Sequence, residues 1–132
     1  MDNKPQSPQS PVILLVEDDP LLIKMYSTKF LREGFIVKNA GDGEEGLRVA
    51  TEEKVDFMIV DVMMPKMSGS DMLVKLRQNP KTAGIPAIVL TNLTQQDEAA
   101  KLKTLGVKEY LIKADLTPSE VVNKVKAYLQ AP

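Results

Sequence analysis

Short runs of consecutive apolar residues recur along this chain from position 12 onward. They are VILLV at 12–16, FIV at 35–37, FMIV at 57–60, AIVL at 87–90 and YLI at 110–112. Runs this short, rich in β-branched residues, favour strands over helices, and their lack of polar alternation is typical of strands covered on both faces. The pattern therefore predicts a parallel sheet with five buried strands.

The segments between the runs are long enough for helices, and the last of them is the most regular. Its apolar residues recur at helical spacing, at Val121, Val122, Val125, Tyr128 and Leu129. Thr117 is a suitable cap, Pro118 fits the first helical position, and Glu120 completes a capping box with Thr117. This helix is therefore expected to begin at Pro118, with one apolar stripe facing the core.

The first helix has similar end signals. Asp19 precedes Pro20 at its predicted start and Gly34 follows its predicted end, so we expect it to span about residues 20–33. Strand and helix alternate along the chain without an internal repeat. This order predicts an open α/β domain with right-handed crossovers and helices on both faces of the sheet.

Length and composition indicate one domain with a short tail. At 132 residues and 43% apolar content, the chain is the right size for a single core. Residues 1–11 (MDNKPQSPQSP) are rich in Pro, Gln and Ser and have almost nothing to bury, so we expect a disordered tail there. We expect the folded domain to span residues 12–130.

Composition also narrows the chemistry and the surroundings. Seventeen basic and eighteen acidic residues leave a net charge of −1, which gives no global attraction to nucleic acid or to an anionic membrane. The chain has no cysteine and no histidine, so any metal must be bound by oxygen, and any phosphohistidine must lie on another chain. No apolar run reaches the roughly 18 residues of a membrane span, and no signal peptide is recognisable. We expect a cytoplasmic protein.

Four of the apolar runs end in polar residues that are able to carry chemistry. In α/β sheets, ligands bind outside the carboxyl ends of the strands. The residues at those ends are Glu17, Asp18 and Asp19 after the first run, Asp61 after the third, Thr91 after the fourth and Lys113 after the fifth. If the first and third strands are neighbours, their carboxylates crowd together, and a cation is needed to offset the repulsion.

Magnesium suits such a cluster, because it prefers carboxylate, water and phosphate oxygens. Asp61 is then a candidate nucleophile toward a phosphoryl group, as in other aspartyl-phosphate chemistry. Lys113 and the metal would neutralise the developing charge, and the Thr91 hydroxyl would bond a phosphoryl oxygen. The modified state would then pull on the loop after Thr91, and that pull would be the signal.

These strand ends, with the segment DVMMPKMSG at 61–69, resemble the bacterial response-regulator receiver family over about residues 12–129. The resemblance implies the flavodoxin-like receiver fold, with strand order 2-1-3-4-5. By position, it implies the metal ligands Glu17, Asp18, Asp61 and the Met63 carbonyl, and the catalytic set Asp61, Thr91 and Lys113. In length, the chain is similar to the chemotaxis regulators of this family, which consist of a single receiver domain.

The resemblance also implies a role and partners. A receiver is a signalling domain, not an enzyme, although it assists its own phosphorylation and dephosphorylation. A histidine kinase or histidine phosphotransfer protein would donate the phosphoryl group, and a downstream effector protein or output domain would respond. The fourth helix, fifth strand and fifth helix would present the signal, with Tyr110 rotating as the Thr91 loop tightens. Homodimerisation on phosphorylation is left open.

The residue after Lys113 departs from the family pattern. The family usually has a proline there, in a cis peptide, whereas this chain has Ala114. A cis bond before alanine costs about 3 to 4 kcal/mol, so we expect a trans peptide. Lys113 is still expected to reach the site, while the loop into the last helix follows another path.

Three further positions bear on the lifetime of a phosphorylated state. Asn92 stands where the family usually has a small residue, and its bulk is expected to narrow access to Asp61. Met63 and Leu93 occupy the positions that tune hydrolysis in this family, and neither side chain can orient a water by hydrogen bonding. We therefore expect slow autodephosphorylation.

Two other functions remain as alternatives. A pseudo-receiver, which signals by interaction without phosphorylation, would be favoured if a key side chain were missing, but none is. A flavin-binding protein or a phosphohydrolase on a similar sheet needs a glycine- and hydroxyl-rich phosphate loop or a DxD pair after a strand, whereas the first strand is followed by EDDP at 17–20.

The remaining motifs are interpreted as structural. GDGEEG at 41–46 matches the dinucleotide-binding fingerprint, but its acidic residues would repel a pyrophosphate and it follows the second strand, so a turn and helix start is the better interpretation. Some of the methionines at 63, 64, 67 and 72 are expected to fill core space under the loop. The lysines are interpreted as solvated helix faces, not a nucleic-acid footprint, at Lys101, Lys103, Lys108, Lys124 and Lys126.

Overall fold

A parallel sheet of five strands runs through the domain, in a computed structural model that describes residues 10–64, 66–92 and 96–130. The strands are β1 (Val12–Val16), β2 (Ile36–Ala40), β3 (Phe57–Val60), β4 (Ala87–Thr91) and β5 (Val107–Ile112). Their order is β2-β1-β3-β4-β5, and every neighbouring pair is parallel. The predicted sheet and strand order are confirmed, although β2 and β5 are longer than the apolar runs that mark them.

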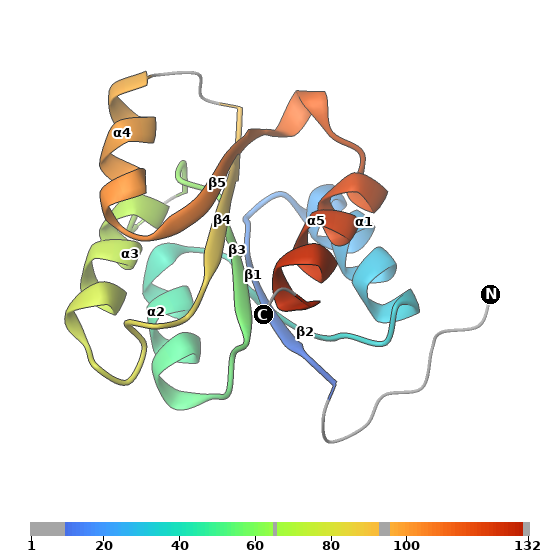
Figure 1. The fold of residues 1–132 in the computed structure, drawn as a ribbon, viewed down its shortest axis with the longest axis horizontal. Coiled ribbons are helices and arrows are strands. Elements are labelled where there is room, and N and C mark those ends of the chain that lie inside the picture. The colour runs from blue at the N-terminus through green and yellow to red at the C-terminus, as the bar shows by residue number, and fades with distance from the viewer. Residues whose placement is uncertain (1–9, 65, 93–95, 131–132) are drawn as a thin grey trace.

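Helices cover both faces of this sheet (Figure 1). They are α1 (Pro20–Arg32), α2 (Gly43–Glu52), α3 (Gly69–Gln78), α4 (Gln96–Thr104) and α5 (Pro118–Gln130), with a short 3-10 helix, η1 (Lys113–Asp115), after β5. α1 and α5 lie on one face, and α2, α3 and α4 lie on the other. This arrangement is the predicted two-sided α/β domain.

Alternate residues of β1 divide the core into two layers. All of β1 is buried, but Leu14 and Val16 belong to the layer under α2, α3 and α4, whereas Ile13 and Leu15 belong to the layer under α1 and α5. Successive side chains of a strand point to opposite faces, which explains the unbroken apolar run. Each fully buried Leu or Ile contributes about 1.5–3 kcal/mol, so β1 stabilises both layers.

The first and last helices begin where their caps predict. The Asp19 carboxylate accepts a hydrogen bond from Leu21 N at 2.9 Å, and α1 ends one residue earlier than predicted, at Arg32. At α5, Glu120 N donates to Thr117 Oγ1 at 3.2 Å, and Thr117 N donates to Glu120 Oε1 at 3.0 Å. The predicted capping box is therefore present.

The chain enters the sheet just before β1. Residues 1–9 of the predicted tail lie outside the described residues, so the tail and the domain limits stay predictions. Ser10 is buried, and the Pro11 carbonyl accepts a hydrogen bond from Ile36 N at 2.9 Å. Within the described ranges, none of the helices has the length and apolar character needed to cross a membrane.

Candidate functional site

Three carboxylates meet at the carboxyl ends of β1 and β3. β1 lies between β2 and β3, and its backbone hydrogen bonding with both neighbours continues one residue past the strands. Asp61 N donates to the Val16 carbonyl at 2.9 Å, and Glu17 N donates to the Ala40 carbonyl at 2.9 Å. Carboxylate oxygens of Glu17, Asp18 and Asp61 all lie within 4.8 Å of one another. The structure therefore brings these three residues together.

Lys113 reaches this cluster from the end of β5. Its Nζ lies 2.6 Å from Glu17 Oε1 and 2.8 Å from Asp61 Oδ2. Glu17 and Asp61 are buried and the Lys113 side chain is nearly so, with exposed fractions of 3%, 8% and 10%. Buried charges are tolerated only when they are paired, and here one ammonium pairs with two carboxylates.

Backbone amides hold the other oxygens of the two buried carboxylates. Glu17 Oε2 accepts hydrogen bonds from the amides of Asp18 and Asp19, each at 3.1 Å. Asp61 Oδ1 accepts from Met63 N at 3.0 Å. Together with Lys113, these donors fix the orientation of both carboxylates.

The buried position of the cluster shifts two pKa values. Burial raises the pKa of the Glu17 carboxyl, and the hydrogen bonds from Lys113 and Asp19 N oppose that shift only in part. Burial by itself would lower the pKa of the Lys113 ammonium, but the hydrogen bonds to Asp61 and Glu17 and the attraction of their charges together outweigh burial and raise that pKa. Lys113 therefore remains charged at neutral pH.

The donor set fits a hard divalent cation. Glu17, Asp18 and Asp61 carry more negative charge than Lys113 alone neutralises, and Asp18 is exposed, which leaves the cluster open to solvent. Magnesium is bound in proteins by one or two carboxylates, with water and phosphate oxygens completing an octahedron. The Met63 carbonyl, a further ligand implied by the resemblance, belongs to the segment directly after Asp61. The cluster therefore supports the predicted magnesium site.

Thr91 ends β4, the strand next to β3. Val60 pairs with Val89 in the register of these strands, so Thr91 and Asp61 lie close to the same level of the sheet edge. Thr91 is buried, and the Asn92 side chain that follows it is exposed. Leu93 lies outside the described residues, so the expected slow hydrolysis stays a prediction, as does the effect of Asn92 on access.

The connection from β5 into α5 has a trans peptide before Ala114 and a short helical turn. No peptide bond in the described ranges is cis, and residues 113–115 form η1, in which Leu116 N donates to the Lys113 carbonyl at 3.3 Å. Lys113 reaches both carboxylates from this turn. The expected trans bond before Ala114 and the reach of Lys113 are both confirmed.

Comparison with known proteins agrees with this geometry. The family model described as the response regulator receiver domain matches residues 13–126. This chain is a member of that family. The Probable transcriptional regulatory protein TcrX of Mycobacterium tuberculosis is 35% identical over 123 residues, covering 92% of this chain and 51% of that protein. The alkaline phosphatase synthesis transcriptional regulatory protein PhoP of Bacillus subtilis is 34% identical over 118 residues, covering 89% of this chain and 48% of that protein.

A solved structure shares the fold at a lower sequence identity. The chemotaxis response regulator CheY4 of Vibrio cholerae superposes with a TM-score of 0.82 at 26% identity, covering 90% of this chain and 98% of that one. This receiver spans about half the length of the curated relatives it matches. It is therefore the receiver domain of a response regulator, a signalling domain of two-component systems.

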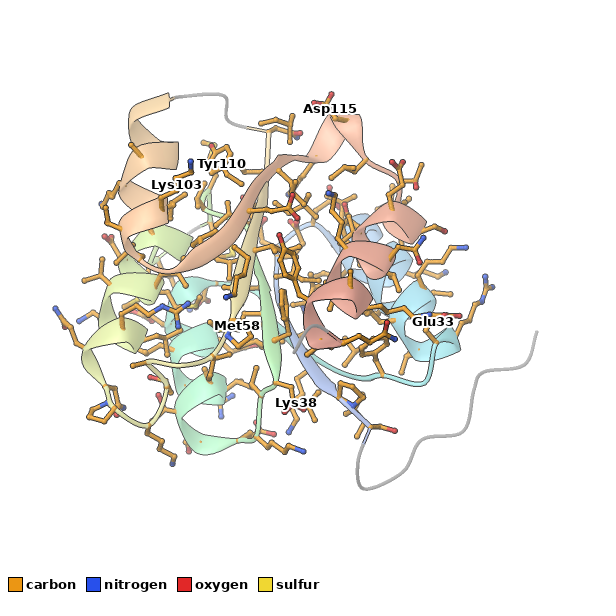
Figure 2. All side chains as sticks on the ribbon, viewed as in Figure 1. Glu33, Lys38, Met58, Lys103, Tyr110 and Asp115 are labelled. Atoms are coloured by element: carbon orange, nitrogen blue, oxygen red, sulfur yellow. The ribbon has the colours of Figure 1, made fainter. Side chains whose placement is uncertain are left out.

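Tyr110 lies on the face of β5 that is covered by α4 (Figure 2). It is half-buried and packs against the core layer that contains Leu102 of α4. This is the position expected for a side chain that responds to movement of the segment after Thr91. Its rotation stays a prediction.

The structural interpretations of the remaining motifs agree with the receiver. Asp42 caps α2 by accepting a hydrogen bond from Glu45 N at 2.9 Å, so GDGEEG is a turn and helix start. Met72 is fully buried and Met64 and Met67 pack against the core, whereas Met63 is 59% exposed. The five lysines singled out above lie outside the core, and two of them form ion pairs at the surface, Lys124 with Glu109 and Lys126 with Glu33.

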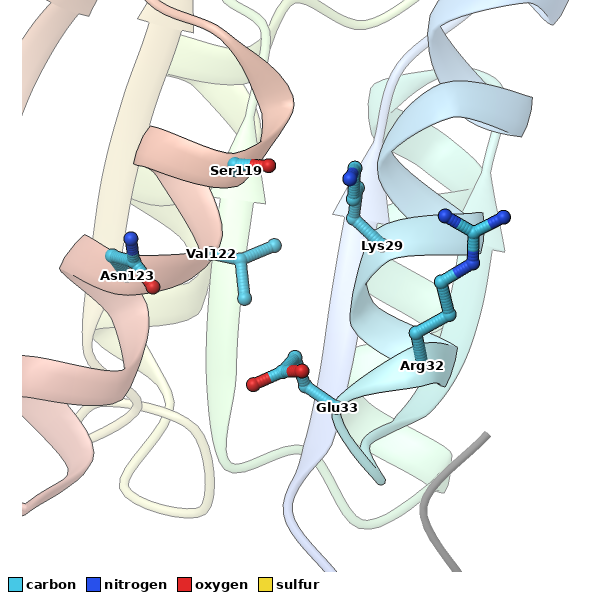
Figure 3. Close-up of a pocket in the computed structure, with 6 residues that line it drawn as sticks. All are labelled: Lys29, Arg32, Glu33, Ser119, Val122 and Asn123. Carbon is cyan, nitrogen blue, oxygen red and sulfur yellow. The ribbon is translucent and has the colours of Figure 1, made fainter. Parts of the chain in front are cut away.

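Two hollows differ in their relation to the site. One, of about 380 Å³, adjoins the carboxylates and is lined by Asp18, Val62, Met63, Met64 and Ser68. The other, of about 280 Å³, is a groove between α1 and α5 (Figure 3), lined by Lys29, Arg32, Glu33, Ser119, Val122 and Asn123. Only the first contains residues of the carboxylate site or its loop, so only the first bears on the chemistry.

The sequence reasoning missed an exposed apolar patch on α1 of the receiver. Leu21 is 64% exposed and Met25 is 39% exposed, and together with Pro118 they line a surface hollow of about 440 Å³. The spacing of four residues between Leu21 and Met25 places them on one side of the helix. The sequence signal for this patch was the spacing of Leu21 and Met25, because these two residues lie outside the buried stripe of α1, which runs through Tyr26 and Phe30.

Proposed function

We propose that this receiver takes a phosphoryl group onto the Asp61 carboxylate, with Mg²⁺ bound, from a phosphohistidine on a partner histidine kinase or histidine phosphotransfer protein in the cytoplasm. The observation that carries the proposal is the buried pairing of Lys113 with Asp61 at 2.8 Å, beside the carboxylates of Glu17 and Asp18. A nucleophile, a fixed cation and an oxygen-only donor set for magnesium thus lie in one place.

In the proposed step, an oxygen of Asp61 forms a bond to phosphorus while the bond from phosphorus to the donor imidazole nitrogen breaks. The electron pair of the broken bond stays on the imidazole, and the product is an aspartyl phosphate. Bound Mg²⁺ supplies positive charge against the phosphoryl oxygens. Lys113 holds Glu17 and Asp61 together before transfer, so it is already beside the charge that develops.

The signal would follow from contacts that exist only in the phosphorylated state. Thr91 ends β4, and its hydroxyl would donate a hydrogen bond to a phosphoryl oxygen, which would draw the following segment toward Asp61. Tyr110 packs on the same side as α4 and would respond to that movement. The surface of α4, β5 and α5 is thus the proposed output face, for an effector protein, an output domain or a second copy.

The exposed patch on α1 is the proposed docking face for the phosphohistidine donor. α1 carries three basic residues and no acidic one, and two of the basic residues, Lys24 and Lys29, line the same hollow as Leu21 and Met25. An apolar patch rimmed by one sign of charge favours an amphipathic helix with acidic flanks. The helix directly follows the Asp18–Asp19 turn, so a donor docked there would be next to the carboxylates.

Intact mass spectrometry tests the proposed function. The chain is incubated with acetyl phosphate, with and without Mg²⁺, beside Asp61→Asn and the control Asp115→Asn, an exposed acid on η1 (Figure 2). We expect one phosphoryl group to be gained only with Mg²⁺, by the wild type and by Asp115→Asn but not by Asp61→Asn.

A wild-type chain that gains no phosphoryl group would contradict the proposal and favour a pseudo-receiver. Obstruction by Asn92 would give the same result for a different reason. Asn92→Ala separates these cases, because removal of the amide restores labelling only if access to Asp61 is what fails.

A further inference from the structure

The start of α2 is bound to the loop that follows Asp61. The first amides of any helix lack partners within the helix. In α2, Glu45 N donates to the Asp42 carboxylate at 2.9 Å, whereas Gly43 N donates to the backbone carbonyl of Met67 at 2.9 Å. Met67 belongs to the connection between β3 and α3, so this hydrogen bond joins the second helix to the active-site loop.

The approach of the two backbones is too close for a side chain at position 43. A Cβ built on Gly43 would lie 2.3 Å from the Met67 carbonyl oxygen and 2.8 Å from its carbon. Both are backbone atoms, which cannot rotate away. By contrast, a Cβ at Gly41, two residues earlier in the same GDGEEG segment, would meet nothing within 4 Å. Of these two glycines, only Gly43 leaves no room for a side chain, and the backbone that it meets belongs to the active-site loop.

A second contact joins the same two segments. Lys66 has a φ of 64°, and among the described residues it is the only one other than glycine with a positive φ. Left-handed backbone of this kind persists only when surrounding contacts hold it. The Lys66 Nζ lies 3.7 Å from Asp42 Oδ2, and Met67 beside it packs against the core and accepts the hydrogen bond from Gly43.

The loop is fixed at its two ends near the site. At its start, Met63 N donates to Asp61 Oδ1 at 3.0 Å, and at its end Gly69 N donates to the Val62 carbonyl at 3.3 Å. A Cβ on Gly69 would lie 2.3 Å from the Asp61 carbonyl oxygen, so α3 also begins directly against the site. Because both ends of this short loop are held, a displacement of Met67 would also move Asp61 and Met63.

We propose that Gly43 is a positioning residue for the Asp61 site. Its close contact with Met67 sets the path of the active-site loop, and through that path it sets how the Asp61 carboxylate and the Met63 carbonyl are presented to Mg²⁺. The inference rests on the proposed function, because it concerns the magnesium bound there. It gives the GDGEEG segment a role in metal binding that its likeness to a dinucleotide fingerprint does not suggest.

The test compares Gly43→Ala with Gly41→Ala in the full chain. Isothermal titration with MgCl₂ gives the dissociation constant, and circular dichroism at the same temperature verifies that each variant is folded. We expect Gly43→Ala to weaken Mg²⁺ binding about tenfold, the lower end of what loss of a support around metal ligands costs. Gly41→Ala should bind as the wild type does, because its Cβ points into open space.

The outcomes separate the inference from a general loss of stability. A purely structural role for Gly43 would lower the melting temperature but leave the dissociation constant of the folded protein at the wild-type value, and that result would overturn the proposal. If Gly43→Ala does not fold, Met67→Gly replaces it, since glycine at position 67 loosens the backbone that accepts the Gly43 hydrogen bond without introducing a clash. Met67→Gly should also weaken binding, and wild-type affinity would again contradict the inference.

A wild-type chain that binds no Mg²⁺ would be a failure of the proposed function itself. In the other case, the wild type binds Mg²⁺ and is labelled on Asp61, but Gly43→Ala binds Mg²⁺ with equal affinity. That result would leave the proposed function intact and remove the role of Gly43. The two failures are therefore distinguishable in one set of titrations.

Discussion

At the scale of single residues, Lys113 supplies the positive charge that offsets the buried carboxylates of Glu17 and Asp61. Its ammonium lies within hydrogen-bond distance of both Glu17 and Asp61, and all three side chains are at most 10% exposed. The raised pKa of Lys113 has the same origin, since the hydrogen bonds and the charges of the two carboxylates together outweigh the effect of burial. Removing the lysine would leave two buried like charges with backbone hydrogen bonds but without a cationic partner.

We therefore expect Lys113→Met to lower the free energy of unfolding by about 3 kcal/mol in metal-free buffer, the usual cost of removing one partner of a buried pair. Lys124→Met is the matched control, because Lys124 forms its ion pair with Glu109 at the surface. That variant should lose about 1 kcal/mol or less. Urea denaturation measures both, and equal losses would contradict the buried-pair interpretation.

At the scale of elements, α1 serves two purposes on its two sides. Tyr26 and Phe30 are buried against the sheet, whereas Leu21 and Met25 are exposed near the carboxylates. The buried side explains why the helix packs where it does. The exposed side has no structural need for apolar residues, which is why we propose it as the face that docks the phosphohistidine donor.

A negative charge introduced into the exposed apolar patch of α1 separates docking from chemistry. The donor is an autophosphorylated histidine kinase that labels the wild type. Leu21→Glu should lower the rate of phosphotransfer from this kinase about tenfold, as expected when an anchor residue of an interface is lost. It should leave labelling by acetyl phosphate unchanged. Ala100→Glu, an exposed position on α4, is the control. Equal slowing with both donors would show that Leu21 acts on the site and not on docking.

At the scale of the whole molecule, the sheet gathers negative charge that the folded chain only partly neutralises. The carboxylates of Glu17, Asp18 and Asp61 come from two strands and meet only when the sheet forms. A cation that binds there binds the folded state and not the unfolded chain. Such binding stabilises the fold by mass action.

We expect Mg²⁺ at a hundredfold excess over its dissociation constant to raise the free energy of unfolding by about 2.7 kcal/mol. Thermal or urea denaturation with MgCl₂, against NaCl of equal ionic strength, measures the gain. The Asp18→Asn variant should show only a small part of this gain in the free energy of unfolding. The substitution removes a metal ligand and part of the charge repulsion that the metal offsets. A similar gain in NaCl would mean general screening of charge.

The sequence by itself determined the features that depend on neighbouring residues. The limits of β1 and β3 follow from their apolar runs, and the starts of α1 and α5 follow from Asp19 and Thr117, because strand patterns and helix caps are short-range. The chemistry of the strand ends indicated Asp61 as a candidate nucleophile. The strand order came from the resemblance to the receiver family, and the observed fold and the family match confirm that order. The chemical role of Asp61 remains the proposal.

Only the tertiary structure decided which distant groups meet, and on which side. The pairing of Lys113 with both Glu17 and Asp61 joins the ends of three strands, and the contact of Gly43 with Met67 joins a helix to a loop. The exposure of Leu21 depends on how α1 is rotated against the sheet. Such contacts are set by strand order, rotamers and close packing over long sequence separations, which local patterns do not encode.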